Sequence, residues 1–95
     1  MLDLSASEFV CLRSLLARRL PGREVRAFGS RVQGRAKPHS DLDLVVMAPI
    51  TDLERFEFNA DLDDSDLPFR VDVVVWQELA ESMRAAIGRD SAPVA

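Results

Sequence analysis

The 95-residue chain is predicted to fold as one α/β domain, with a core of about three strands flanked by helices. Three short apolar runs, at residues 24–28, 41–48 and 69–76, are typical of strands. Segments with apolar residues at helical spacing alternate with these runs, and this order favours an α/β fold. The length fits a single domain over residues 1–95. Residues 89–95 have little to pack against and are expected to fray.

Clear start and stop signals mark the first elements. Ser5 and Glu8 form a capping box that opens a helix. Its apolar residues recur at helical spacing at Phe9, Leu12, Leu16 and Leu20, and Pro21-Gly22 ends it. Residues 24–28 then form a strand that stops at Gly29. Residues 30–34 are expected to form one or two helical turns, followed by a loop at 37–40.

The second half of the chain has similar signals. Residues 41–48 form the second strand, which Pro49 ends. Thr51 and Glu54 are a second capping box, opening a helix that reaches about Ala60, and residues 62–68 form an acidic loop. The third strand, residues 69–76, is apolar enough to be buried on both faces. A last helix over residues 77–87 is expected to end at Gly88.

Composition excludes several classes of protein. The single cysteine rules out a disulfide within the chain, and no apolar run approaches the roughly 18 residues of a membrane span. The first residues lack the features of a signal peptide, so a cytoplasmic location is expected. Residues 1–40 carry eight Lys/Arg against three Asp/Glu, and residues 41–95 carry four against thirteen. A net charge of −4 argues against general nucleic-acid binding, whereas a basic region beside carboxylates suits a nucleotide with its metal.

The segment from Gly29 to Asp43 contains the residues best suited to chemistry. The Gly29-Ser30 turn joins a strand to a helical turn, where backbone N–H groups attract anions, although most such turns only reverse the chain. Asp41 and Asp43 share one face of the second strand, about 6.5 to 7 Å apart along the chain. They repel each other unless a cation offsets their charge, which predicts a divalent metal; the alternative is a loop cap and a solvated strand end.

A third acid strengthens this prediction. Asp72 lies within an otherwise apolar strand, where a carboxylate needs a partner. If the third strand lies beside the second, Asp72 joins Asp41 and Asp43. Three carboxylates can hold two Mg²⁺ ions about 3.5 to 4 Å apart, the arrangement used for phosphoryl transfer.

Gly29-Ser30, ten intervening residues, Asp41-Leu42-Asp43 and a later acid in an apolar strand together resemble the signature of the nucleotidyltransferase superfamily typified by DNA polymerase β. The short length resembles its minimal nucleotidyltransferase (MNT) branch. The similarity covers roughly residues 23–76, and none of the five signature positions departs from the pattern.

The resemblance implies a mixed sheet with Mg²⁺ and a nucleoside triphosphate over it. By this analogy, Asp41 and Asp43 coordinate two Mg²⁺ ions. Asp72 coordinates the metal that activates the acceptor hydroxyl and helps to take up its proton. Gly29 and Ser30 hold the β- and γ-phosphates. The implied reaction transfers a nucleoside monophosphate, AMP from ATP, to a hydroxyl group and releases pyrophosphate.

The basic and polar neighbours of the turn are further candidates. Arg31, Arg35 and Lys37 can neutralise the triphosphate, although each alone is better explained as a solvated surface residue. Ser40 can orient a carboxylate or simply complete the loop. His39, the only histidine, is better explained as a loop residue than as a catalytic base, because bound metals already lower the pKa of a hydroxyl.

Three functional hypotheses remain open at this level. In MNT proteins the activity is associated with a HEPN partner, a helical ribonuclease toxin that the antitoxin adenylylates in at least some systems. The resemblance therefore implies an antitoxin enzyme whose acceptor is a partner protein, since so short a chain has no separate acceptor domain. The alternatives are an antitoxin that acts by binding alone, and transfer to a small molecule such as an aminoglycoside. Oligomeric state and base preference are left open.

Overall fold

The computed structural model describes residues 2–37 and 40–95, which form a mixed four-stranded sheet with helices on both faces. The strands are β1 (Val25–Phe28), β2 (Leu42–Val46), β3 (Val71–Val75) and β4 (Ser91–Pro93), in the spatial order β3-β2-β1-β4. β1 is antiparallel to β2 and β4, whereas β2 and β3 are parallel. The predicted α/β class is confirmed, with four strands in place of three.

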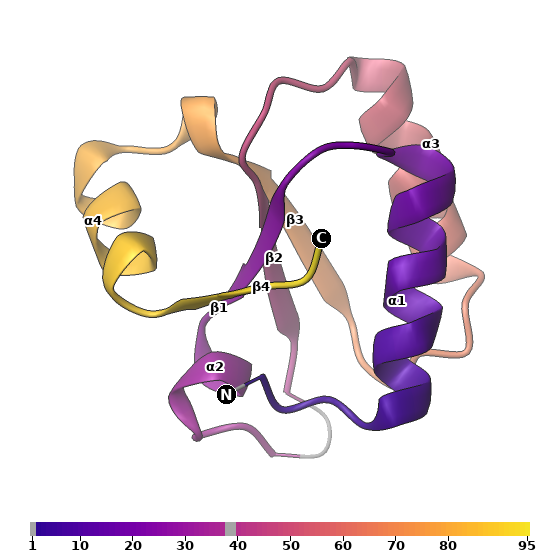
Figure 1. Cartoon of the computed structure of the whole chain (residues 1–95), viewed down its shortest axis with the longest axis horizontal. Coiled ribbons are helices and arrows are strands. Elements are labelled where there is room, and N and C mark those ends of the chain that lie inside the picture. The colour runs from indigo at the N-terminus through magenta and orange to yellow at the C-terminus, as the bar shows by residue number, and fades with distance from the viewer. Residues whose placement is uncertain (1, 38–39) are drawn as a thin grey trace.

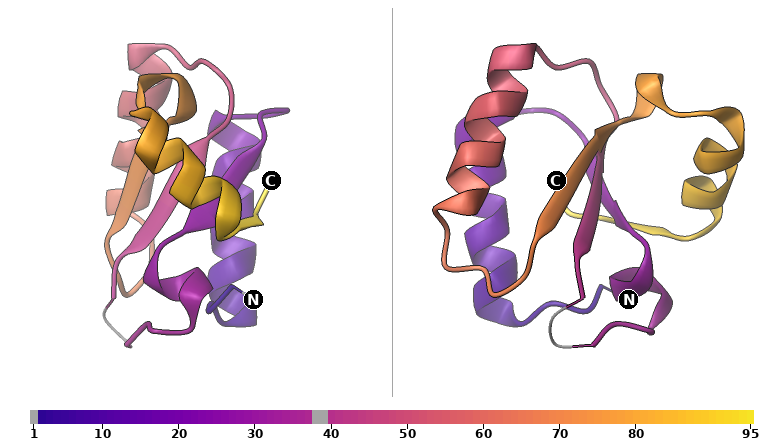
Figure 2. Two further views of the ribbon diagram at one scale, coloured as in Figure 1. Left: turned by 90° about the vertical axis from the view of Figure 1, so that its left-hand side faces the viewer. Right: turned by 180° about the vertical axis from the view of Figure 1, so that it is seen from behind.

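Helices α1 (Ala6–Arg19) and α3 (Asp52–Asp63) lie side by side over one face of the sheet (Figure 1). Helix α4 (Glu81–Arg89) lies on the opposite face, in front of the strands when the molecule is turned (Figure 2, left). Both predicted capping boxes are present, Ser5 with Glu8 at α1 and Thr51 with Glu54 at α3. They satisfy backbone N–H groups that would otherwise lack partners, and thereby fix where each helix begins.

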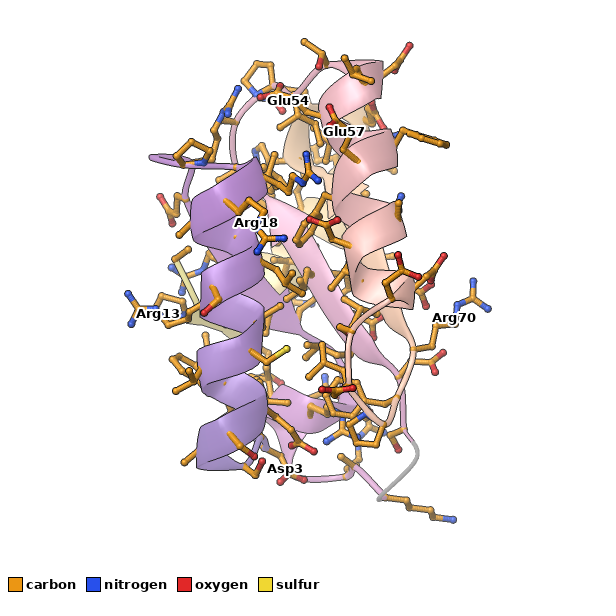
Figure 3. The ribbon with its side chains drawn as sticks, turned by 90° about the vertical axis from the view of Figure 1, so that its right-hand side faces the viewer. Asp3, Arg13, Arg18, Glu54, Glu57 and Arg70 are labelled. Atoms are coloured by element: carbon orange, nitrogen blue, oxygen red, sulfur yellow. The ribbon has the colours of Figure 1, made fainter. Side chains whose placement is uncertain are left out.

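The core lies between the sheet and the α1–α3 layer. Leu12 and Leu16 of α1, Phe58 of α3 and Leu44 of β2 are each at most 1% exposed. Ion pairs join the two helices outside this core: Arg19 Nε lies 2.6 Å from Asp61 Oδ2, and Arg19 Nη1 lies 2.7 Å from Glu57 Oε2. Arg18 and Glu57 are seen between the helices in Figure 3. These ion pairs link α1 to α3, the two helices that together cover one face of the sheet.

The C-terminal residues are not frayed, which corrects the sequence-based expectation. Ser91–Pro93 pair with β1, and Val94, only 3% exposed, belongs to the core cluster. The Val94 N–H also donates to the Val25 carbonyl at 2.9 Å. Gly88 does not end the last helix but lies within α4, whose predicted first turns form a separate 3-10 turn, η1 (Trp76–Glu78). Helix α3 likewise runs to Asp63, past the predicted end at Ala60.

Burial of Val94 provides a direct test of this correction. Val94→Asp is expected to lower the free energy of unfolding by several kcal/mol, because it places an unpaired carboxylate in the core. Ala95→Asp adds the same charge at the neighbouring exposed position and is expected to have little effect. Urea denaturation of the two variants provides the comparison, and equal midpoints would contradict the described packing of the C-terminal residues.

Within the described residues, no helix has the length and apolar character needed to cross a lipid bilayer.

Candidate active site

The candidate residues lie where three strand ends meet, at one end of the sheet. Because β1 runs antiparallel to β2 and β2 runs parallel to β3, the end of β1 lies beside the starts of β2 and β3. Phe28, Asp43 and Asp72 are direct partners across these strands. They form one row of side chains, which we name the row of acids after its two aspartates. Helix α2 (Ser30–Gln33) follows β1 at the same end of the sheet, which is the lower end of the molecule in Figure 1. The third strand thus lies beside the second, which is the condition under which Asp72 joins Asp41 and Asp43.

Asp43 and Asp72 point to the face opposite the α1–α3 layer. Leu42 and Leu44, which flank Asp43, are buried in the core, so Asp43 faces the other way by strand alternation. Burial raises the pKa of the Asp43 carboxyl above its usual value, and the negative charges of Asp72 and Asp41 raise it further. The charges of Asp41 and Asp72 therefore reach Asp43 and add to the effect of burial in disfavouring its ionisation, which a bound cation would reverse.

Gly29 lies against the Asp43 carboxylate. Its backbone has φ +84° and ψ −156°, a conformation essentially restricted to glycine. A Cβ placed on Gly29 would lie 2.5 Å from Asp43 Oδ2, closer than real Cβ contacts permit. Glycine is therefore required at this position both by the turn and by the approach of the turn to the carboxylate.

Ser30 begins α2 directly after this turn. The Gly29 carbonyl accepts hydrogen bonds from the Val32 and Gln33 N–H groups, at 3.0 and 3.1 Å, and this closes the turn. The amide and hydroxyl of Ser30 make no hydrogen bond to any described residue. Two donors beside Asp43 are thus available for a ligand.

Asp72 is paired with Arg70, a residue that the sequence motif does not include. Arg70 Nε lies 3.0 Å from Asp72 Oδ1, and the two side chains are 76% and 39% exposed. Residues two apart in a strand share a face, so this pairing could have been read from the sequence. At such exposure an ion pair contributes little stability, and a stronger cation can displace it. β3 is an edge strand and only half-buried, not buried on both faces as predicted.

Asp41 immediately precedes β2 and is exposed. Its charge acts on Asp43, but the described residues contain no ready-made group of three Asp, Glu, His or Cys side chains able to hold a metal ion. The fold thus brings Asp41, Asp43 and Asp72 to the same end of the sheet. Asp43 and Asp72 are register partners in neighbouring strands, and Asp41 precedes β2.

Arg31 is not a solvated surface residue. It is 5% exposed and its guanidinium lies 4.1 Å from the centre of the Phe69 ring. Its Nε donates to the Ser40 carbonyl at 3.0 Å, and its Nη1 donates to the Asp3 carbonyl at 2.9 Å. Arg31 therefore connects α2 to the segments that precede α1, β2 and β3.

The other polar candidates lie in the loop before β2. Ser40 Oγ accepts a hydrogen bond from the Lys37 N–H at 2.8 Å, so its hydroxyl completes the loop. Arg35 and Lys37 are exposed, and Arg35 Nη2 donates to Gln33 Oε1. His39 lies outside the described residues. Among these candidates, Arg35 and Lys37 are positioned to approach an anion from solvent.

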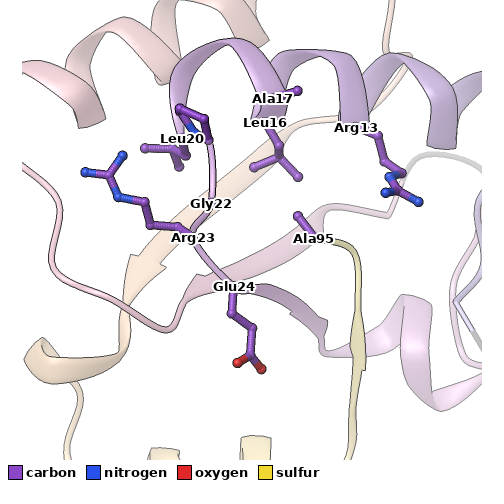
Figure 4. A pocket seen from close by; sticks show the side chains of 9 residues that line it. Arg13, Leu16, Ala17, Leu20, Gly22, Arg23, Glu24 and Ala95 are labelled. Atoms are coloured by element: carbon purple, nitrogen blue, oxygen red, sulfur yellow. The ribbon is translucent and has the colours of Figure 1, made fainter.

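Two cavities adjoin the row of acids. One of about 190 Å³ borders Gly29 and is otherwise lined by β1, α2, α4 and Asp90. Its mainly apolar walls include Phe28, Met83 and Ile87. The other, of about 330 Å³, includes Asp72 and lies toward α3. A third cavity, of about 420 Å³ between the end of α1 and Ala95, lies at the opposite end of β1 and touches none of the acids (Figure 4).

Comparison with known proteins identifies the class. The family model described as "Nucleotidyltransferase domain" matches residues 11–94, from α1 to the end of the described core. "Probable protein adenylyltransferase MntA" of Haemophilus influenzae is 39% identical over 88 residues, covering 90% of this chain and 77% of that protein. A solved structure provisionally assigned as a minimal nucleotidyltransferase is 34% identical, with a TM-score of 0.72 and coverage of 92% of this chain and 89% of that one.

Two further solved structures share the fold at lower identity. A toxin–antitoxin crystal structure with AMP-PNP is 22% identical, with a TM-score of 0.75, covering 92% of this chain and 72% of that one. A complex of tri-AMPylated Shewanella oneidensis HEPN toxin with MNT antitoxin is 16% identical, with a TM-score of 0.63, covering 92% and 68%.

The chain is therefore an enzyme of the nucleotidyltransferase class. Within that class it belongs to the minimal nucleotidyltransferase family.

Proposed function

We propose that the protein transfers AMP from ATP, with Mg²⁺, to a hydroxyl group of a HEPN-type toxin, and that it acts as the antitoxin of that pair. The observation that carries this proposal is the contact between the Gly29 turn and the carboxylate of Asp43, a residue that lies opposite Asp72 in the pairing of β2 with β3. This contact brings a phosphate-binding turn next to carboxylates that repel each other, as an enzyme handling a metal–triphosphate complex requires.

The relatives support the choice of nucleotide and acceptor. The Haemophilus influenzae relative bears the name of a protein adenylyltransferase, and this chain matches 77% of its length. Proteins of the same fold have been crystallised as toxin–antitoxin complexes, one with AMP-PNP and one with an AMPylated HEPN toxin. A cytoplasmic location, where ATP and a toxin would be met, is part of the proposal.

The donor set fits Mg²⁺. Asp41, Asp43 and Asp72 offer carboxylate oxygens, the ligands that Mg²⁺ prefers. Burial, and then the negative charges of Asp72 and Asp41, raise the pKa of Asp43, and a bound cation would offset both effects. Two Mg²⁺ ions, when bound, would neutralise the phosphates and make the acceptor hydroxyl more acidic.

The two ends of the row of acids suggest how ATP is oriented. The unbonded amide and hydroxyl of Ser30, with Gly29, would hold the β- and γ-phosphates at the β1 end. The small apolar cavity beside Gly29 would take the nucleoside. Arg35 and Lys37 would approach the phosphates from solvent. The α-phosphorus then lies over Asp43, between the turn and Asp72.

The reaction follows from this orientation. The acceptor oxygen attacks the α-phosphorus, the bond from that phosphorus to the bridging oxygen breaks, and pyrophosphate leaves on the Gly29 side. The hydroxyl proton passes to the Asp72 carboxylate, which must first leave Arg70. A carboxylate within reach of the attacking hydroxyl can act as its general base.

Incubation with α-³²P-ATP and Mg²⁺, with and without a HEPN-type toxin as partner, tests the proposal after denaturing electrophoresis. Label is expected on the partner, and it should disappear with Asp41→Asn or Asp43→Asn. A stable complex without label would favour an antitoxin that acts by binding alone. Neither label nor complex would favour a small-molecule acceptor.

A further inference from the structure

β3 has one edge that no strand covers. Within the described residues it pairs only with β2. The Leu42 N–H donates to the Arg70 carbonyl at 2.9 Å, so residues 70, 72 and 74 bond to β2. Because alternate residues of a parallel strand bond to the same neighbour, the backbone groups of Val71 and Val73 point outward. The structure gives these groups no hydrogen-bond partner among the described residues.

A cavity of about 330 Å³ runs along this edge. It is lined by Asn59 and Asp63 of α3 and by residues 70–73 of β3 and its approach, so Asp72 belongs both to the row of acids and to this cavity. Arg70 projects outward beside the end of α3 (Figure 3). The cavity therefore lies along the open edge on the α3 side of the sheet, and the Asp72 carboxylate points to the other side of the same edge.

The direction of the reaction assigns a role to the open edge of β3. In an in-line displacement, the attacking oxygen and the leaving oxygen stand on opposite sides of the phosphorus. If pyrophosphate leaves at the Gly29 turn, beside β1, the acceptor must approach from the far end of the row. That end is Asp72 on β3, beyond which lie the open edge and the cavity.

The pairing of the sheet indicates which kind of acceptor fits. Phe28, Asp43 and Asp72 are direct partners, and directly paired side chains point to the same face. A residue of an added strand opposite Asp72 would continue this row, with its backbone about 4.8 Å further out. Its side chain would lie on the same face as the Asp72 carboxylate. An extended polypeptide satisfies this geometry and also bonds to Val71 and Val73, whereas a small polyol offers no repeating backbone donors and acceptors.

The charges near the edge add a preference. Asp63 lines the cavity, and Asp64 and Asp66 are exposed in the segment that follows α3. A basic residue close to the hydroxyl-bearing residue would complement these acids.

We propose that the acceptor binds as an extended segment added to the open edge of β3, with a Ser, Thr or Tyr hydroxyl opposite Asp72 and a basic residue nearby. This inference rests on the proposed function and specifies its acceptor. The acceptor oxygen forms the new bond to the α-phosphorus, pyrophosphate departs, and Asp72 takes the hydroxyl proton.

Residue-resolved amide hydrogen exchange tests this docking mode. The probes are a HEPN-type toxin as partner protein, Mg²⁺ and a non-hydrolysable ATP analogue blocked between the α- and β-phosphates. Exchange at Val71 and Val73 is expected to slow at least tenfold when the partner is added. Asp72 and Val74 serve as internal controls, because their amides already bond to β2. Labelling of the partner by α-³²P-ATP without added protection at Val71 and Val73 would overturn the edge proposal and leave the proposed function intact. No labelling would overturn both.

A matched pair of variants on α3 provides a kinetic test. Asn59→Arg places a long side chain in the cavity, whereas Ala60→Arg adds the same charge one residue away, at an exposed position that does not line it. The first is expected to raise the KM for the partner at least tenfold and to leave the KM for ATP unchanged. The second should change neither constant. Equal effects of the two variants on the KM for the partner would contradict the proposal.

Discussion

Asp43→Asn is expected to abolish nucleotidyl transfer without weakening the fold. A neutral amide at the centre of the row of acids removes a metal ligand, and a loss of at least about 1,000-fold in kcat follows if several kcal/mol of transition-state stabilisation disappear. In metal-free buffer at pH 7, the variant should melt at the same temperature as the parent chain or higher. The reason is that a neutral amide removes the cost of burying a charge and the repulsion from Asp72 and Asp41, the two causes that raise the pKa of Asp43.

The pH dependence tests whether the charge of Asp43 is the cause of this difference in stability. The folded-state pKa of Asp43 lies above the ordinary value of 3.8, so the folded protein binds this proton more tightly than the unfolded chain. The resulting stability is fully present below the unfolded pKa and is lost as the pH rises through the folded pKa. The advantage of Asp43→Asn in melting temperature should therefore shrink as the pH falls toward 4. A variant that unfolds at pH 7 without metal would instead show that Asp43 is structural.

Gly29→Ala is expected to have the second largest effect. Its Cβ would meet Asp43 Oδ2 at 2.5 Å, and the backbone conformation at φ +84° costs a residue with a Cβ about 1 to 3 kcal/mol. The carboxylate must move away from the turn, so transfer should fall by at least about 100-fold, the size of effect that a misplacement near 1 Å can have.

Gly34→Ala is the matched control for this substitution. Gly34 also has a positive φ, +75°, but a Cβ added there would have nothing within 4 Å of it. Both variants should lose stability in thermal melts, whereas only Gly29→Ala should lose transfer activity. Equal activities of the two variants would show that contact between the turn and Asp43 does not matter for the reaction.

Local signals were sufficient to predict much of the fold and the row of acids. Both capping boxes, the turn at Gly29 and the shared face of Asp41 and Asp43 depend on neighbours in sequence or on strand alternation. The placement of Asp72 beside Asp43 also required the third strand to lie beside the second. β4 could not be predicted in this way. Its three residues, which include a proline, carry no strand pattern and become a strand only because β1 presents a free edge to them.

Arg31 illustrates the same limit at the site. Its position beside the turn suggested a solvated surface residue that could contact a phosphate, but its partners are the carbonyls of Asp3 and Ser40 and the ring of Phe69. These groups are distant in sequence and are brought together only by the completed sheet. The open edge of β3 was likewise hidden, because an apolar run does not reveal whether a strand lies at the centre or the border of a sheet.

The most direct test of nucleotidyl transfer is to identify the bond in ATP that breaks. The chain, Mg²⁺ and the helical partner are incubated in parallel with ATP labelled at the α-phosphate or at the γ-phosphate, and the partner is then isolated under denaturing conditions. Attack at the α-phosphorus predicts label on the partner from α-³²P-ATP alone, dependent on Asp43, with the γ-label released as pyrophosphate. Label transferred from γ-³²P-ATP would show attack at the other end of the triphosphate and would contradict the arrangement of Gly29, Asp43 and Asp72 proposed for this site.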